Sequence, residues 1–126
     1  MKVEVISCGP LKTNTIVVKK GKTVLVIDPA CKEVASTTLL RGDIYVVLTH
    51  GHWDHILGIP FMPTDRVYMH RGDIPMLKDP SLNGSMWGLK VPFTVNATPV
   101  PLCEGLRSLG DISFICLLYT SPSPRD

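Results

Sequence analysis

Short apolar runs separated by turn residues fill the first half of the chain, and this pattern predicts a series of strands. Gly21-Lys22 marks a turn between the second and third of these runs. The fourth run is nearly all apolar, as expected for a strand that is buried on both faces. The predicted strands of this half cover residues 2–7, 15–19, 23–27 and 44–48.

One stretch between these runs has helical spacing instead. Apolar or small residues recur there at intervals of three and four, which predicts a helix that Arg41-Gly42 ends. The positions that carry this spacing are Cys31, Val34, Ala35, Thr38 and Leu39.

The second half mixes the two patterns. The predicted elements are short helices at 56–59 and 73–78, a strand at 66–69, an exposed loop at 79–92, and a hairpin that pairs 98–103 with 110–115. Glu104-Gly105 is the predicted turn of that hairpin. This order of elements favours an α/β fold, a layered arrangement in which helices cover a sheet.

Composition fits this picture. The 126 residues suffice for at most one domain, and 44% hydrophobic with 19% charged residues suits a globular interior. The net charge of +2 is too small to indicate nucleic acid or an anionic membrane as a partner. No apolar run approaches the roughly 20 residues of a membrane-spanning helix. The N-terminus does not resemble a signal peptide, so we expect a cytoplasmic protein.

The four cysteines give no metal-binding pattern. They stand at positions 8, 31, 103 and 116, and no two have the C-x-x-C spacing of a structural zinc knuckle. Without a secretion signal we expect reduced thiols, with Cys31 a minor candidate for a place near a metal site.

The last eleven residues, 116–126, differ in style from the rest. Their Ser-Pro-Ser-Pro run cannot continue a strand ladder because proline has no N–H to donate. One interpretation is a disordered tail. The other is a non-native extension, because the run resembles the translation of an adaptor used in sequencing libraries. We expect residues 1–115 to be the native part, a partial domain.

The strongest chemical signal follows the buried strand at 44–48, in the segment Thr49-His50-Gly51-His52-Trp53-Asp54-His55. In extended backbone, side chains two residues apart point the same way, so His50 and His52 can hold one ion. A tight turn after residue 52 would let Asp54 and His55 reach a second ion. Imidazole and carboxylate ligands suit zinc, iron or manganese. Three histidines and an aspartate within six residues disfavour the alternative of a loop that merely caps a strand.

This T-H-x-H-x-D-H pattern resembles the signature of the metallo-β-lactamase-fold hydrolases. Three flanking segments resemble the glyoxalase II-like (hydroxyacylglutathione hydrolase-like) branch of that family, and the resemblance covers about residues 1–115. These segments are Gly9-Pro10-Leu11-Lys12-Thr13-Asn14, Val26-Ile27-Asp28-Pro29 and Asp54-His55-Ile56-Leu57-Gly58.

The resemblance implies an αββα sandwich, of which this chain would be the N-terminal half. It implies two divalent metal ions, zinc first, with iron or manganese as alternatives. His50 and His52 would bind one ion, and Asp54 and His55 the other. Asp54 would also be catalytic, by orienting the attacking water. Thr49 and Asp28 would support the site without ligating.

The activity implied is hydrolysis of a small-molecule thioester, such as a hydroxyacyl-glutathione, by a metal-bridging hydroxide. One alternative is a mononuclear-iron sulfur dioxygenase of the same fold, and another is a truncated metal-binding fragment without function. The family's later ligands, including an H-T-x-G-H-T histidine, are absent from this sequence. We therefore expect activity in the full-length parent and an inactive fragment. Trp53, within the motif, and His70, outside it, are interpreted as packing residues.

Overall fold

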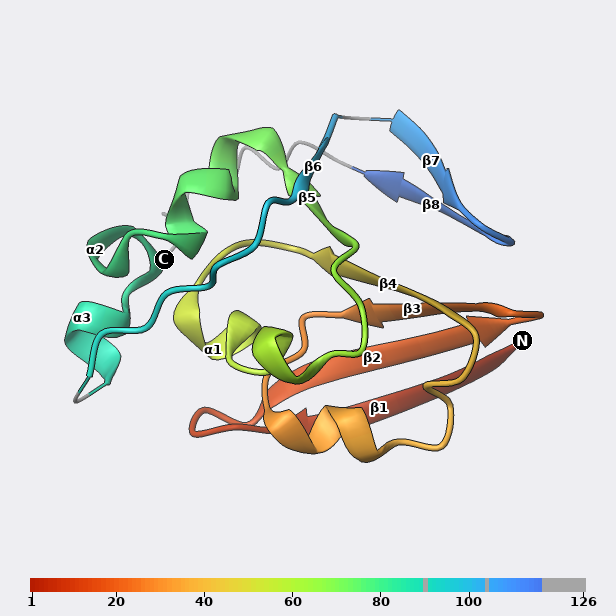
Figure 1. The fold of residues 1–126 in the computed structure, drawn as a ribbon, viewed down its shortest axis with the longest axis horizontal. Helices are drawn as coiled ribbons and strands as arrows, with labels where there is room; N and C mark the ends of the chain where they lie inside the picture. The colour runs from red at the N-terminus through yellow and green to blue at the C-terminus, as the bar shows by residue number, and fades with distance from the viewer. Residues whose placement is uncertain (90, 104, 117–126) are drawn as a thin grey trace.

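One sheet of six strands organises the molecule, and the computed structural model describes it within residues 1–89, 91–103 and 105–116. The strands lie side by side in chain order (Figure 1). They are β1 (Lys2–Cys8), β2 (Thr13–Lys20), β3 (Thr23–Ile27), β4 (Asp43–Leu48), β5 (Val67–His70) and β6 (Val100–Leu102). The predicted non-native tail lies outside the described residues from position 117 on.

The first three strands form an antiparallel meander, and from β4 onward each strand runs parallel to the one before it. Gly21 makes the tight turn into β3 at a φ of +60°, which glycine adopts at little cost. Parallel strands need crossover connections, and these carry the helices. The result confirms the predicted mixed α/β fold and places the carboxyl ends of β3, β4 and β5 at one edge of the sheet.

The helices are shorter than the sequence predicts. The helix expected over 31–39 is a single 3-10 segment, η1 (Lys32–Ser36), because the backbone becomes extended at Thr37. Val34 and the preceding Cys31 belong to a hydrophobic core cluster, and Leu39 packs against it, whereas Ala35 and Thr38 are exposed. The remaining helical turns are α1 (Trp53–Ile56), η2 (Ile59–Phe61), η3 (Arg71–Leu77), α2 (Pro80–Asn83) and α3 (Ser85–Gly88). The last two lie where an irregular loop was expected.

The prediction that residues 98–103 pair with residues 110–115 in a hairpin was wrong. Residues 100–102 form β6, which pairs in parallel with β5, and the hairpin consists of β7 (Gly105–Leu109) and β8 (Ile112–Cys116). Its two-residue turn is Gly110-Asp111, with Gly110 at a φ of +58°. The Thr23 hydroxyl accepts a hydrogen bond from the Asp111 N–H, so the turn rests on the first residue of β3.

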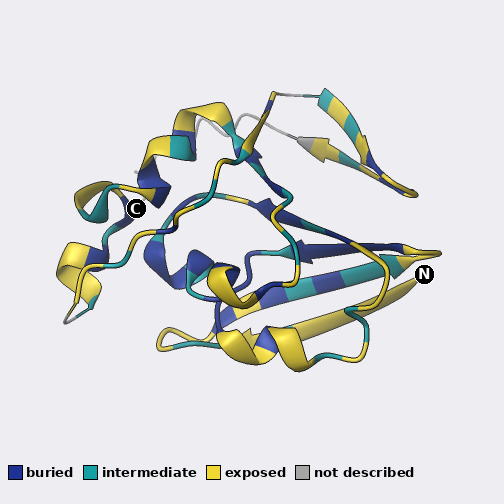
Figure 2. Cartoon of the chain, viewed as in Figure 1, coloured by how far each residue is buried: buried dark blue, intermediate teal, exposed yellow. Residues whose placement is uncertain are grey.

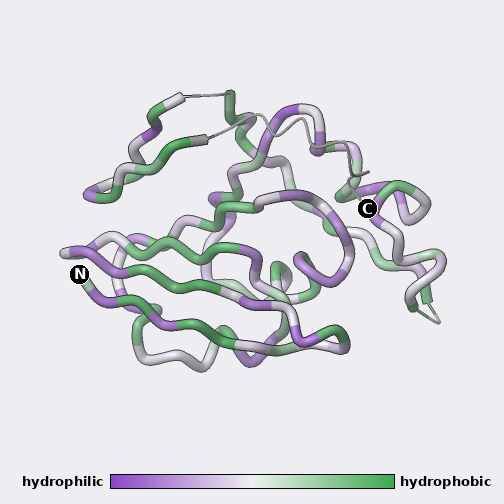
Figure 3. Tube along the Cα trace, turned by 180° about the vertical axis from the view of Figure 1, so that it is seen from behind, coloured by the Kyte–Doolittle hydropathy of each residue, from purple (hydrophilic) through white to green (hydrophobic). Residues whose placement is uncertain are grey.

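Two hydrophobic clusters cover the two faces of the sheet. The larger lies under the helical segments and includes Val24, Val46, Ile56 and Met69. The smaller lies between the sheet and the β7–β8 hairpin and includes Leu25, Val47, Leu109 and Ile112. The strands are correspondingly the most hydrophobic segments (Figure 3).

The edge of the sheet at β1 is poorly covered. Figure 2 shows this strand as mostly exposed, and the side chains of Val3 and Val5 are 58% and 60% exposed. Strand β1 pairs with β2 on one side and has no partner strand on its other side within the described residues. An exposed edge strand with apolar side chains favours association between chains. In the described part of the chain, no helix is long and apolar enough to cross a membrane.

Two of the cysteines are not the reduced thiols that the sequence predicts. Cys8 and Cys31 form a disulfide, with their Cα atoms 5.9 Å apart, whereas Cys103 is free and exposed. The two partners are 23 residues apart in the sequence. No local spacing marks the pair, because the end of β1 and the segment after β3 become neighbours only in the folded sheet.

Candidate metal centre

The histidine motif lies where β4 leaves the sheet. Residues 49–52 continue the chain past the strand, and α1 begins directly at Trp53 with His52 as its N-cap residue. The predicted tight turn after residue 52 is thus the first turn of a helix. It directs Asp54 and His55 back toward the two histidines that precede it.

The four motif side chains lie within contact of one another. The ring centroids of His50 and His55 are 4.1 Å apart, and those of His50 and His52 are 6.0 Å apart. Asp54 lies between two of the imidazoles, with Oδ1 at 2.7 Å from His52 Nδ1 and Oδ2 at 3.5 Å from His55 Nε2. Within the described residues, no three His, Cys, Asp or Glu side chains are already arranged around one ion; the motif residues pair with each other instead.

Asp28 holds the motif from the neighbouring strand end. Its Oδ1 accepts a hydrogen bond from the Thr49 N–H at 2.8 Å, and its Oδ2 accepts one from the Thr49 hydroxyl at 2.6 Å. Oδ2 also lies 3.0 Å from His55 Nδ1. Asp28 is buried, with φ at +54°, a left-handed conformation that aspartate tolerates better than most residues. The supporting role expected for Asp28 and Thr49 matches these contacts.

Thr13 is a supporting residue that sequence reasoning did not single out. Its buried hydroxyl donates to Asp54 Oδ2 at 2.7 Å, across 41 residues of sequence. The only available signal was its place in the Gly9–Asn14 segment, whose resemblance to a family branch does not predict a contact. Both oxygens of Asp54 are therefore fixed, one by His52 and the other by Thr13.

These contacts set the protonation of the site. Burial lowers the pKa of His50, and the nearby His55 lowers it further. Burial would also lower the pKa of His55, but the hydrogen bond and the charge of Asp28 outweigh it and raise that pKa. Burial would raise the pKa of Asp54, yet hydrogen bonds from His52 and Thr13 hold it below its ordinary value. The site thus favours an ionised Asp54 and a neutral His50, the states that metal ligation requires, whereas the raised pKa of His55 favours its protonated form, from which a bound ion would displace a proton.

Glycines let the covering segment approach the motif closely. A Cβ atom added to Gly84 would lie 2.7 Å from His52 Nε2, and one added to Gly88 would lie 2.5 Å from Trp53 Nε1. Trp53 is 5% exposed, which agrees with its interpretation as a packing residue. His70 ends β5, and its Nδ1 accepts a hydrogen bond from the Gly72 N–H in a local turn.

The donor set fits a divalent ion. Three imidazoles and one carboxylate gather on one strand end and one helical turn, and the outer nitrogen of His55 is held by a carboxylate, as is usual for metal-bound histidine. Cys31, a minor candidate for this site, is engaged in the disulfide.

Known proteins share this fold. Two solved structures are similar to this chain. That of BLEG-1 B3 metallo-beta-lactamase has 28% sequence identity and a TM-score of 0.78 over 90% of this chain. That of TTHA1623 in a di-iron-bound form has 30% identity and a TM-score of 0.69 over 85% of this chain. This chain covers 59% and 57% of their respective lengths. No functionally curated protein matches it significantly. Residues 8–126 match the sequence profile of the metallo-beta-lactamase superfamily, and the chain therefore belongs to that superfamily.

Proposed function

We propose that the protein to which this chain corresponds is a metal-dependent hydrolase of small-molecule thioesters, such as hydroxyacyl-glutathiones. The observation that carries the proposal is the gathering of His50, His52, Asp54 and His55 at the end of β4 and the start of α1. The Gly9–Asn14 segment supports the thioester branch by its resemblance to that branch, and Thr13 within it holds Asp54.

In this proposal His50 and His52 hold the first metal ion, and Asp54 and His55 hold the second. When bound, such ions supply Lewis acidity and lower the pKa of water to about 7. Asp28 keeps the proton on Nδ1 of His55, which leaves its Nε2 free to ligate. Thr13 and His52 keep the Asp54 carboxylate ionised and fixed in direction, so that it can orient a water molecule.

We infer further that catalysis needs ligands beyond these four. The solved relatives are longer than this chain, which covers 59% and 57% of them. The part of the relatives that it does not match is the natural source of the missing ligands. The chain by itself would then bind metal and hydrolyse substrate slowly or not at all, whereas the product of the extended reading frame would be active.

Iron chemistry is a second candidate, favoured by the relative described in a di-iron-bound form. In a sulfur dioxygenase, His50 and His52 would still be ligands. A third possibility, β-lactam hydrolysis, is suggested by the name of the other relative.

One set of assays separates these activities. The protein, loaded with zinc or with iron, is tested for hydrolysis of S-lactoylglutathione, hydrolysis of a chromogenic β-lactam, and oxygen consumption with glutathione persulfide. We expect thioester hydrolysis by the extended protein that His50→Ala abolishes and His70→Ala, a change outside the motif, leaves intact. Oxygen consumption or lactam hydrolysis without thioester hydrolysis would reject the thioester assignment. Metal content unchanged by His50→Ala would reject the ligand assignment.

A further inference from the structure

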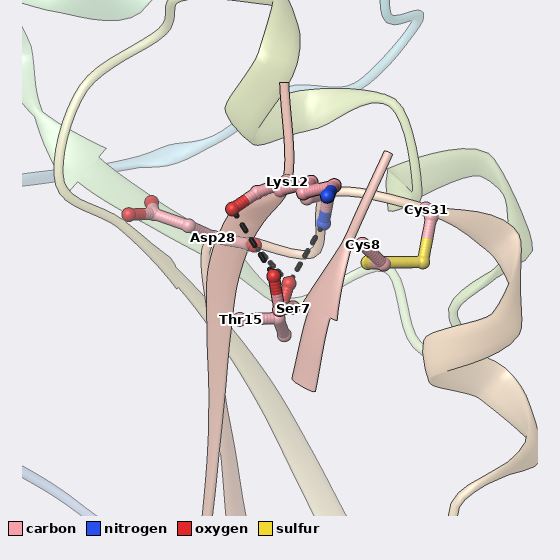
Figure 4. Close-up of a disulfide and its surroundings, with 7 residues drawn as sticks. Ser7, Cys8, Lys12, Thr15, Asp28 and Cys31 are labelled. Carbon is pink, nitrogen blue, oxygen red and sulfur yellow. Dashed lines mark hydrogen bonds between the residues drawn. A yellow bond between two sulfur atoms is a disulfide. The ribbon is translucent and has the colours of Figure 1, made fainter. Parts of the chain in front are cut away.

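The Cys8–Cys31 disulfide ties together two segments that support the metal motif. Cys8 is the last residue of β1, and Cys31 directly precedes η1. Figure 4 shows the link between the end of β1 and the loop before η1, with Asp28 and Thr15 nearby. The Asp28 carboxylate points away from the sulfur atoms, so the disulfide acts on the backbone of the loop and not on the carboxylate itself.

Each end of the disulfide is close in the chain to a group that holds a proposed ligand. Cys8 is the cross-strand partner of Thr13, whose hydroxyl donates to Asp54. Cys31 follows Asp28 by three residues, and Asp28 contacts His55 and Thr49. The cross-link therefore connects the support of Asp54 with the support of His55.

The other contacts of this loop are neutral hydrogen bonds. Thr15 Oγ1 donates to the Asp28 carbonyl and accepts from the Ala30 N–H, while the Gly58 N–H donates to the Pro29 carbonyl. The loop also passes closely over Gly58, where an added Cβ would lie 2.4 Å from the Cys31 carbonyl oxygen. Strand β1 lies at the edge of the sheet, and the disulfide attaches it covalently to this loop.

We propose that Cys8–Cys31 is a redox-sensitive cross-link that holds the metal motif in its binding arrangement, and that a dithiol reductant weakens metal binding by opening it. Cys8 is half-buried and Cys31 is buried, so the reductant thiolate attacks the Cys8 sulfur and expels the Cys31 thiolate. The second thiol of the reductant then displaces the Cys8 thiolate and closes its own disulfide. Two electrons pass from the dithiol to the protein, and two protons end on the cysteine sulfurs.

This inference rests on the proposed metal site, and the test uses the full chain with two readouts. The first is Zn²⁺ affinity, measured by competition with a chromophoric chelator, before and after reduction with a phosphine that is then removed. The second, without metal, is hydrogen exchange at the Thr49 N–H, which donates to Asp28. We expect reduction to weaken Zn²⁺ binding about tenfold, the scale of lost outer-shell support, and to speed that exchange.

Variants provide the controls. C8S/C31S should show weak Zn²⁺ binding and fast Thr49 exchange with or without the reductant. C103S, which removes the free exposed thiol, should respond to reduction like the unmodified chain. Peptide mapping after alkylation should find Cys8 and Cys31 protected until the reductant is added.

Two results would overturn the proposal: alkylation of Cys8 and Cys31 without reductant, or equal Thr49 exchange in the oxidised and reduced chains. Equal Zn²⁺ affinity in the two states would overturn its link to metal binding. If the oxidised chain binds no Zn²⁺ at all, the proposed function fails. Comparison of Thr49 N–H exchange in the oxidised and reduced chains then tests by itself whether the cross-link holds the motif.

Discussion

Replacing Asp28 with asparagine tests how the strand ends hold the metal motif. Asparagine has nearly the same shape, tolerates the left-handed backbone at this position, and can still accept from the Thr49 N–H. It loses the negative charge that faces the Thr49 hydroxyl and His55 Nδ1. A charged hydrogen bond contributes about 1.5–3 kcal/mol and a neutral one about 0.5–1.5 kcal/mol. With two such bonds weakened, the metal-free chain should lose about 1–3 kcal/mol of stability.

The same change should lower the pKa of His55. In the unmodified chain burial lowers this pKa, but Asp28 raises it above its ordinary value of 6.5. Without the charge, burial dominates, so the pKa of His55 should fall below its value in the unmodified chain. Because the folded pKa is raised, the Asp28–His55 pair stabilises the fold fully below pH 6.5 and loses this contribution as pH rises through the folded pKa. The stability lost in Asp28→Asn should therefore be larger at about pH 5.5 than at about pH 9.

Two measurements on the metal-free chain check this reasoning. NMR titration of the histidine ring protons gives the pKa of His55, and urea unfolding at the two pH values gives the stabilities. Asp65→Asn removes an exposed carboxylate outside the motif and serves as the control. A His55 pKa that is the same in Asp28→Asn and in the unmodified chain would refute the reasoning, as would a stability loss independent of pH.

Three further changes probe other contacts. Thr13→Val should weaken Zn²⁺ binding about tenfold while Thr13→Ser, which keeps the hydroxyl, retains it; equal affinities by chelator competition would contradict the role of Thr13. Gly58→Ala should destabilise the fold by about 1–3 kcal/mol in urea unfolding, since its Cβ would meet backbone oxygens, and an unchanged midpoint would be inconsistent with that packing. Val5→Lys on the exposed edge strand should reduce light scattering by the chain, and unchanged scattering would exclude this edge as the site of association.

The strand pattern and the motif were readable from the sequence because both are local. Strand β3 has the predicted bounds, and β1, β2, β4 and β5 differ from prediction by at most two residues at an end. Their runs of β-branched and apolar residues, with a turn at Gly21, leave few alternatives. The helices were less predictable: Ala35 and Thr38, two of the residues with three-to-four spacing, are exposed, and only a short 3-10 segment forms there.

The sequence alone determined that a segment rich in histidine, the candidate metal-binding segment, follows a buried central strand, because the spacing of its histidines and the apolar run before it are properties of consecutive residues. Only the tertiary structure decided what holds that segment. Thr13 reaches Asp54, Asp28 reaches His55, and Cys8 reaches Cys31 across 41, 27 and 23 residues. These pairs meet because β1–β2 turn back at one end of the sheet, beside the carboxyl ends of the parallel strands β3 and β4. Such proximity depends on strand order and register, which single-residue patterns do not encode.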